Sequence, residues 1–389
     1  EDVATGVALL DNWGLVHALF HFSPALFARA DGWRIAEGHS LGELEPAPIF
    51  AQHWAAAPRA LLEVVQNARC RPVRQWAIQM ARRDLAAVRE LVSVEELFAM
   101  LTLDDAELVA FAAELLRDKP GLDGLDPDRW LTLVATASSA TVELLGELLE
   151  RHLNPTRLSL AQVLRLTMSR LLPLARLGLS WLRTRTIQTE EDHTALLALV
   201  EAQSEPLRRE TLAWARAKLA AWPELHPEWL LAFLDSRHTD VRAEGLAWFR
   251  DDIRVRDDVR LWLRLVETPH DEIRIALVGA LEQRLAGRDP FAALLGAIDP
   301  EHLRLLWASV LLNIHRGGRA KPAVLRQLVR RIQERPDDFV TLLPLLAVAL
   351  RSVRGPEWRA GLAAIVQLLE RQPARASEVR LAFPELELV

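Results

Sequence analysis

Residues 237–250 (RHTDVRAEGLAWFR) and residues 270–284 (HDEIRIALVGALEQR) share one pattern. Each stretch begins with a short polar turn, continues with a β-branched residue and an arginine, and ends in an apolar segment. The arginines Arg242 and Arg274 lie 32 residues apart. In the first stretch, Val241 is followed by small or apolar residues at positions +4, +7 and +8, which is the period of one helix face. The two stretches therefore predict helices that recur along the chain.

The same pattern recurs at a nearly constant spacing from residue 51 onward. Turn signals, mostly an Asp, Asn or His followed by Pro, fall between the recurrences, where proline favours the first turn of a helix. A period of about 30–35 residues is typical of stacked helical hairpins. We therefore expect an all-α fold, a right-handed α-solenoid of antiparallel helical hairpins. The positions that align are Arg74, Val109, Glu143, Arg176, Arg208, Arg242, Arg274 and Arg304.

This pattern resembles the HEAT repeat family, in which the second helix of a hairpin opens with an acidic residue, then Val-Arg, then a small residue. The best matches are residues 240–242 (DVR) and 271–274 (DEIR), followed by residues 72–74 (PVR) and 206–208 (PLR). The resemblance covers roughly residues 51–370, although the units around Val109 and Glu143 lack the arginine. It implies that the repeated arginine is structural and bonds acidic groups or carbonyls in neighbouring turns.

The chain divides into three parts on this interpretation. Residues 1–50 do not fit the repeat and are expected to form an irregular N-terminal cap with one or two helices. We expect one helix over residues 7–22, a second short helix after Pro24, and no strand. Residues 51–370 form the repeat array, and residues 371–389 form a partial repeat or a C-terminal cap.

The composition excludes several classes of protein. The only cysteine, Cys70, rules out an internal disulfide framework and a zinc site with several thiolates. A net charge of −6 argues against a general polyanion binder, and no apolar run reaches the length of a membrane span. The high Arg, Ala and Leu content is typical of a GC-rich bacterial genome. We expect a cytoplasmic protein without membrane contact, bound metal or cofactor.

No motif in the sequence indicates catalysis, so we expect a protein that is not an enzyme. Walker A, Gly-x-Ser-x-Gly and His-Glu-x-x-His sequences are absent. Paired acids such as Asp251 and Asp252 lie in polar turns, where they favour helix N-termini. His17 and His21 share a helix face, but a third ligand is lacking. The tryptophans recur at fixed positions of the repeat, as inter-helix packing requires, namely Trp130, Trp229 and Trp262 in first helices and Trp214 and Trp248 in second helices.

The leading functional prediction is a scaffold for protein–protein interaction that uses the concave surface of the repeat array. The partner would be another protein or other domains of a larger chain. Second helices would contribute the contacting side chains. From their position in the repeat, the candidates are Arg208, Arg209, Glu210, Glu244 and Arg250.

The alternative prediction is a nucleic-acid-binding protein, similar to bacterial DNA glycosylases built on HEAT-like repeats. Resemblance to phycobilin lyases, which are also helical solenoids, is a third possibility, although nothing specific indicates it. One basic cluster comprises Arg69, Arg71, Arg74, Arg82 and Arg83, and a second comprises Arg165, Arg170, Arg176, Arg183 and Arg185. The densest cluster adjoins a Gly-Gly loop that could expose backbone amides to phosphate. Its candidate phosphate contacts are Arg316, Arg319, Lys321, Arg326, Arg330 and Arg331.

Overall fold

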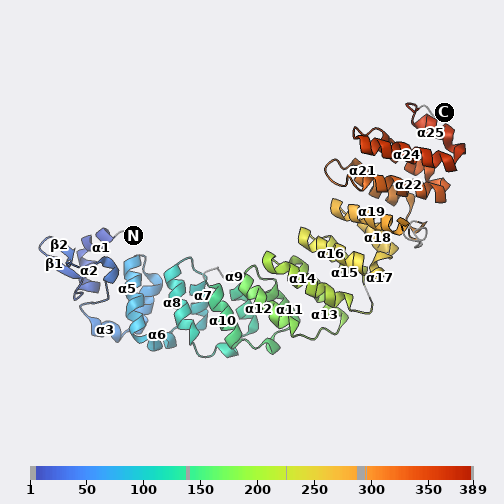
Figure 1. Ribbon diagram of the computed structural model, residues 1–389. Helices are drawn as coiled ribbons and strands as arrows, with labels where there is room; N and C mark the ends of the chain where they lie inside the picture. Colours follow the sequence, from blue (N-terminus) through green and yellow to red (C-terminus); the bar gives the residue numbers. More distant parts are fainter. Residues whose placement is uncertain (1–5, 137–140, 225, 287–293, 295, 387–389) are drawn as a thin grey trace. The chain divides into compact units, whose positions relative to one another are not determined.

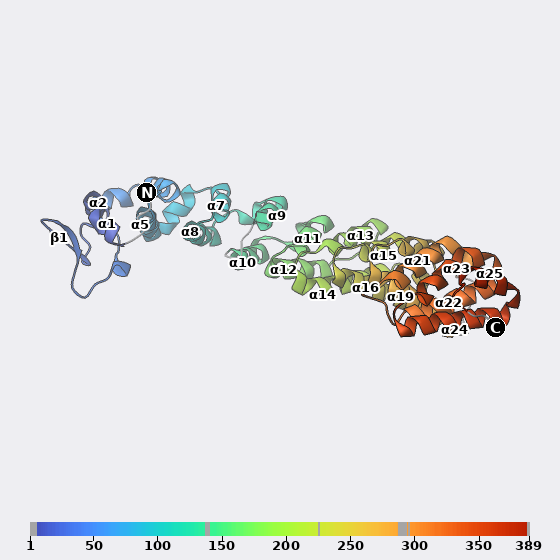
Figure 2. The same ribbon diagram turned by 90° about the horizontal axis from the view of Figure 1, so that it is seen from above.

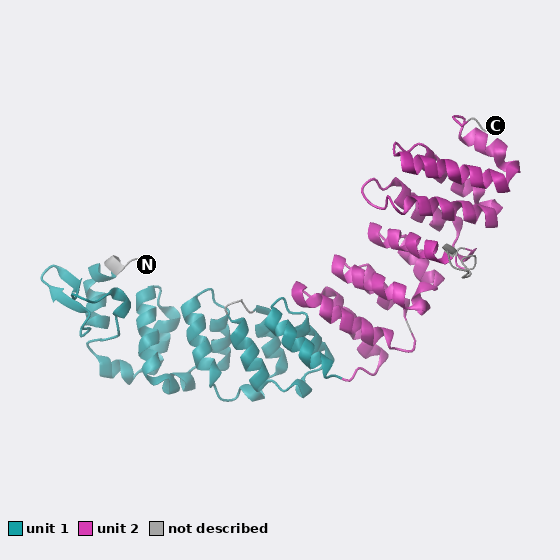
Figure 3. Cartoon of the chain, viewed as in Figure 1, with its two compact units in different colours: residues 1–185 teal, residues 186–389 magenta. Residues whose placement is uncertain are grey.

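The computed structural model describes residues 6–136, 141–224, 226–286, 294 and 296–386. Helices make up most of this part of the chain (Figures 1 and 2). The chain consists of two compact units, Glu1–Arg185 and Thr186–Val389 (Figure 3). In both units, helices that follow one another in the sequence pack as pairs.

Unit 1 begins with a small N-terminal cap and continues with helix pairs. The cap and the short helix after it are α1 (Gly6–Asp11), α2 (Trp13–Phe20), β1 (Leu26–Arg29), β2 (Gly32–Ile35), a 3-10 turn (Leu41–Glu43) and α3 (Ala51–Ala55). The remaining helices are α4 (Pro58–Asn67), α5 (Arg71–Ala81), α6 (Leu85–Leu91), α7 (Val94–Leu101), α8 (Ala106–Arg117), α9 (Pro127–Thr136), α10 (Val142–His152), α11 (Leu160–Thr167) and α12 (Leu172–Arg183).

In each helix pair we call the helix that comes first in the chain the first helix and the one that follows it the second helix. In unit 2, each second helix is longer than the first helix of its pair. Its helices are α13 (Glu190–Ala195), α14 (Glu205–Ala220), α15 (Pro227–Leu234), α16 (Thr239–Asp251), α17 (Ile253–Arg256), α18 (Val259–Val266), α19 (Asp271–Ala286), α21 (Pro300–Leu312), α22 (Lys321–Glu334), α23 (Phe339–Leu350), α24 (Gly355–Arg371) and α25 (Ala376–Ala382). A 3-10 segment, Leu196–Glu201, follows α13.

The N-terminal cap corrects the expectation of an all-α chain. The helix predicted over residues 7–22 is interrupted at Asn12, whose side chain accepts a hydrogen bond from the Leu15 amide at 3.2 Å and so caps α2. After Pro24 the chain forms an antiparallel hairpin rather than a second short helix. A two-residue turn, Ala30 and Asp31, joins the strands, and Gly32, the first residue of β2, has a φ of 141°. Each strand has only four residues, too few to reveal an alternating pattern.

Equivalent helices of successive pairs pack on one another within each unit. In unit 1, α9 packs on α11 and α10 on α12, and Figure 2 shows α7, α9 and α11 on one side of α8, α10 and α12. In unit 2, the second helices α14, α16, α19, α22 and α24 pack in that order, and the first helices α15, α18, α21 and α23 do likewise. The prediction that places Arg304 in a second helix is therefore wrong, because Arg304 lies in the first helix α21.

Three glycines mark the point where the second helix crosses the end of the first. Gly178, Gly245 and Gly361 each lie 11 residues after the last residue of the preceding first helix. A Cβ on Gly178 would lie 2.4 Å from the backbone nitrogen of Thr167, and a Cβ on Gly245 would lie 2.9 Å from the Leu234 side chain. The repeated arginine, such as Arg242, lies eight residues after the last residue of the preceding first helix. The same count in α12 reaches Ala175 rather than Arg176.

We predict that Gly178→Ala destabilises the protein by about 3 kcal/mol, because its methyl group collides with backbone that cannot yield. The midpoint of urea unfolding, followed by far-UV circular dichroism, measures the effect. Gly146→Ala in α10 is the matched control, since nothing lies within 4 Å of the added Cβ. This control should gain up to about 1 kcal/mol from helix propensity. Equal midpoints for the two variants would show that the helices do not approach closely at Gly178.

The expected packing role of the tryptophans is confirmed for most of them. Trp130, Trp229, Trp248 and Trp262 are buried. The half-buried Trp214 is the exception, and the Lys218 ammonium group lies over its ring at 5.9 Å. Buried rings at a repeated position fill the space between helices and leave no face for a ligand.

A bridging arginine near the start of a second helix links one pair to the next. The Arg208 guanidinium donates to the Ala202 carbonyl at 2.7 Å and pairs with Asp240 at 3.0 Å. Arg242 donates to the Ser236 carbonyl at 2.7 Å and pairs with Glu272 at 2.5 Å. Both carboxylates belong to the next second helix. Arg74 makes the corresponding contacts with the Ala68 carbonyl and Asp105, whereas Arg274 pairs with Asp271 of its own helix. The structural role implied by the resemblance is thus confirmed for Arg74, Arg208 and Arg242.

A second set of cations, which we call closing cations, ties together the two ends of seven helix pairs. Each lies at or just after the end of a second helix. Each donates to carbonyls in the segment that leads into its own pair, 27 to 39 residues earlier, where helix ends leave carbonyls without partners. The closing cations are Arg83, Lys119, Arg157, Arg185, Arg254, Arg284 and Arg375.

We predict that Arg242→Met destabilises the protein by about 2 kcal/mol at neutral pH. The substitution leaves the Ser236 carbonyl without its side-chain donor and Glu272 without its nearer, buried cation, and removing one partner of a buried pair is costly. Urea unfolding of the variant measures the loss. Arg250→Met on the same helix is the control, because Arg250 is exposed and its replacement should change stability by less than about 0.5 kcal/mol.

The pH dependence separates the ion pair from lost packing. Burial opposes ionisation of Glu272, but hydrogen bonds from its own backbone amide and from Arg242 outweigh burial and lower its pKa below 4.5. A lowered pKa stabilises the fold above pH 4.5, and this contribution disappears as the pH falls through the folded-state value. The difference between wild type and Arg242→Met should shrink accordingly in acid. A difference that is constant with pH would contradict an ionic role.

Candidate functional site

The described residues provide neither a metal centre nor a membrane span. No group of three or more His, Cys, Asp or Glu residues among them is placed to hold a metal ion. No helix in the described ranges is both long enough and apolar enough to cross a bilayer. His17 and His21 do lie together, with their Nδ1 atoms 3.0 Å apart.

The candidate partner-binding residues divide into two groups. Arg208 is 7% exposed, and its guanidinium group bonds both the Ala202 carbonyl and Asp240. This group therefore stabilises the fold and does not face solvent. Glu244 is half-buried and pairs with Arg216 at 2.8 Å. Arg209, Glu210 and Arg250 are exposed on α14 and α16. Only these last three present their side chains to solvent.

Most of the candidate phosphate contacts are engaged within the protein. Lys321 is 3% exposed and pairs with Glu357 at 3.1 Å, and Arg331 is 2% exposed and pairs with Asp338 at 2.5 Å. Exposed Arg326 and Arg330 pair with Glu282 and Glu334, respectively. Exposed Arg316 lies 3.6 Å from Glu272, and Arg319 is also exposed. The cluster therefore does not form a continuous basic surface.

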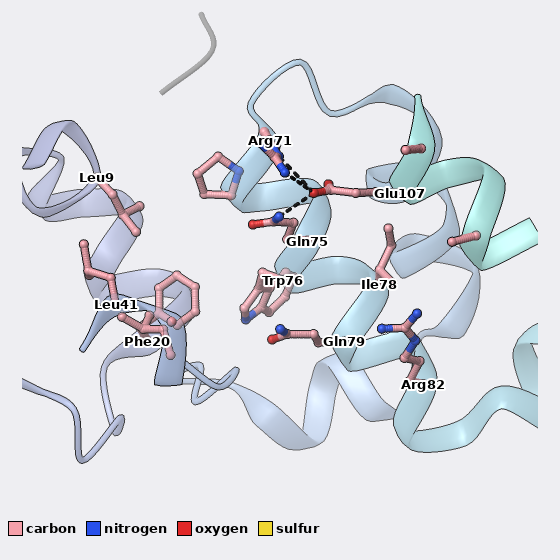
Figure 4. Close-up of a pocket in the computed structure, with 15 residues that line it drawn as sticks. Leu9, Phe20, Leu41, Arg71, Gln75, Trp76, Ile78, Gln79, Arg82 and Glu107 are labelled. Atoms are coloured by element: carbon pink, nitrogen blue, oxygen red, sulfur yellow. Dashed lines mark hydrogen bonds and ion pairs between the residues drawn. The ribbon is translucent and has the colours of Figure 1, made fainter. Parts of the chain in front are cut away.

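A groove of about 680 Å³ runs along the outer face of α5, between the N-terminal cap and α8 (Figure 4). We call it the α5 groove. Cap residues that line it include Leu9, Phe20, Leu41 and Leu44. From α8 it is lined by small and acidic residues, namely Ala106, Glu107 and Ala110.

The apolar part of the α5 groove is fixed by the docking of the cap on α5. Trp76 is buried, and its indole N–H donates to the Leu19 carbonyl of α2 at 3.0 Å. Leu9 and Phe20 are also buried beside it. The closing cation Arg83 holds the cap at a second point through the Pro46 carbonyl at 2.6 Å. These two hydrogen bonds fix the cap against α5, and with it the aromatic and aliphatic side chains that form the apolar wall of the groove.

The polar part of the α5 groove is a row of side chains along α5. Arg71, Gln75, Gln79 and Arg82 follow one another at helical spacing, so they share one face. Arg71 and Gln75 contact the same oxygen of Glu107, at 2.8 and 2.5 Å. The other oxygen of Glu107 is buried and has no hydrogen-bond partner within the described residues. The groove therefore presents the exposed side chains of Arg71, Gln75, Gln79 and Arg82 beside an apolar wall.

No motif in the sequence indicates this groove. Arg71 and Arg82 belong to a predicted basic cluster, but Arg71 pairs with Glu107, and Arg82 pairs with Glu114 at 2.8 Å. The groove forms where α5 meets the N-terminal cap, and the contact between these two segments leaves no pattern in the sequence of either one.

No model of a known protein family matches this chain. No curated protein matches it either.

Proposed function

We propose that the chain is a HEAT-like α-solenoid that serves as a non-catalytic scaffold and binds an extended segment of a partner protein in the α5 groove. The single observation that carries the proposal is the α5 groove, which places hydrogen-bonding amides beside a fixed apolar wall. Pockets that combine an apolar lining with a few polar groups are typical binding sites.

The dimensions of the α5 groove suit a short peptide. The polar row from Arg71 to Arg82 spans about 16 Å at the helical rise of 1.5 Å per residue. An extended peptide covers that distance with about five residues. Gln75 and Gln79 each carry a donor and an acceptor, which match the alternating amides and carbonyls of a peptide backbone. The apolar wall then receives alternate side chains of the bound segment.

The contacts between helix pairs support the solenoid part of the proposal. The bridging arginines, Arg74, Arg208 and Arg242, repeat one geometry along the chain, and each pair packs mainly on its neighbours.

Peptide display on the full chain tests the α5 groove. We expect selected peptides to bind with micromolar affinity, and Ala110→Arg to weaken them at least tenfold, because the new side chain fills the groove from its exposed wall. Ala86→Arg adds the same side chain at an exposed site on α6, outside the groove, and should leave affinity unchanged. Fluorescence anisotropy of labelled peptides measures both effects.

Two results would count against the groove. One is a selection that yields no binding peptide. The other is equal affinity of the selected peptides for Ala110→Arg and wild type, which would place their binding elsewhere on the chain.

A further inference from the structure

Two neighbouring loops of unit 2 expose large apolar side chains. Leu312 is the last residue of α21 and Ile314 lies in the segment that follows it, and Val353 precedes α24, whose first turn carries Trp358. Val353 is fully exposed, Leu312 and Ile314 are 63% and 66% exposed, and Trp358 is 44% exposed. An exposed group of large apolar residues commonly marks an interaction site.

Hydrogen bonds and an ion pair hold the two loops together. The Arg354 guanidinium group donates to the Ile314 carbonyl at 2.8 Å, which joins the loop after α21 to the loop before α24. Buried Lys321 pairs with Glu357 at 3.1 Å, which joins the starts of α22 and α24. The apolar side chains therefore project from a braced edge.

Trp358 occupies a position that has a different role elsewhere in unit 2. Arg242 lies eight residues after Leu234, the last residue of its first helix, and Trp358 lies eight residues after Leu350. Arg242 is buried and bridges to the next second helix. Trp358 is partly exposed instead, so an aromatic ring faces outward where a bridging arginine would otherwise be used.

Arginines surround these apolar side chains. Five of them lie in the same loops and the first turn of α24, namely Arg316, Arg319, Arg351, Arg354 and Arg359. The nearby carboxylates are shared with buried cations, because Glu272 pairs more closely with Arg242 than with Arg316, and Glu357 more closely with Lys321 than with Arg354. Glu385 lies 3.5 Å from Arg351. The edge therefore carries a surplus of positive charge around an apolar centre.

We propose that this edge, which we call the arginine-rimmed patch, binds an acidic peptide segment in which carboxylate and large apolar residues are interleaved. The apolar centre takes up the apolar side chains, and the rim pairs with the carboxylates. Trp and Arg are the residue types enriched in protein interfaces. A protein segment fits better than nucleic acid, because three of the four central residues are aliphatic and cannot stack on bases. It also fits better than a bilayer, because four side chains bury little apolar area.

Fluorescence anisotropy with the full chain tests this proposal. The probe is an array of labelled peptides that interleave Glu or Asp with Leu and Phe at varied spacing. We expect members of the array to bind at low salt. A Gln-for-Glu version and a version with Ser in place of Leu and Phe should bind at least tenfold more weakly.

Variants locate the binding. The double variant Ile314→Ser with Val353→Ser, and separately Arg319→Glu, should each weaken the peptide at least tenfold, and circular dichroism should be unchanged because these side chains are exposed. The matched controls Val340→Ser on α23 and Arg250→Glu on α16 change equally exposed residues and should bind as wild type does. Ala110→Arg should also bind normally, which separates this patch from the α5 groove.

Other outcomes would overturn the proposal. No binding anywhere in the array would refute it, as would equal losses in the control variants. Tighter binding of single-stranded DNA, or of phosphatidylserine vesicles, with losses at Arg319 would assign the patch to a nucleic acid or to a membrane instead.

Discussion

The arrangement of the helices depends on cations that bond backbone carbonyls and carboxylates of neighbouring turns. Bridging arginines such as Arg242 connect consecutive pairs, and closing cations such as Lys119 join the two ends of one pair. Both satisfy polar groups that helix termini leave without partners. The planar guanidinium group suits this role because it donates in several directions at once. Hydrophobic packing drives the helices together, and these cations favour one register between them.

Because many arginines bond other parts of the protein, a cluster of basic residues in the sequence does not by itself indicate a binding surface. A chain with 47 Lys and Arg residues offers many candidates for ligand contact. The structure assigns many of them to internal bonds, as for Arg208 and Arg331, which are buried and paired. Functional surfaces are therefore expected where the arrangement departs from the regular pattern. Our two proposed sites lie at such departures, the junction of the cap with α5 and the loops around Trp358.

The sequence predicts the regular part of the fold well, because the helical period, the turn prolines and the repeated Val-Arg all report local structure. It fails where a contact depends on another segment. The strands at Leu26–Arg29 and Gly32–Ile35 are too short to alternate, and the shift at Arg304 follows from a longer step between helix pairs. Of the candidate site residues, solvent-exposed Arg209 and Arg319 fit a surface role, whereas burial of Arg208 and Lys321 depends on partners about 30 residues away. The α5 groove gives no signal in any single stretch.

The spacing between the second helices is longer at one place in unit 2, and this bears on how such a chain can change in evolution. The second helices α16 and α19 begin at Thr239 and Asp271, but the next one, α22, begins only at Lys321. Nevertheless α19 packs on α22, and α18 packs on α21. The extra residues, which lie before α21 and between α21 and α22, therefore leave the stacking intact. The chain can acquire insertions at these junctions without redesign of its core, and new recognition loops can arise there one at a time.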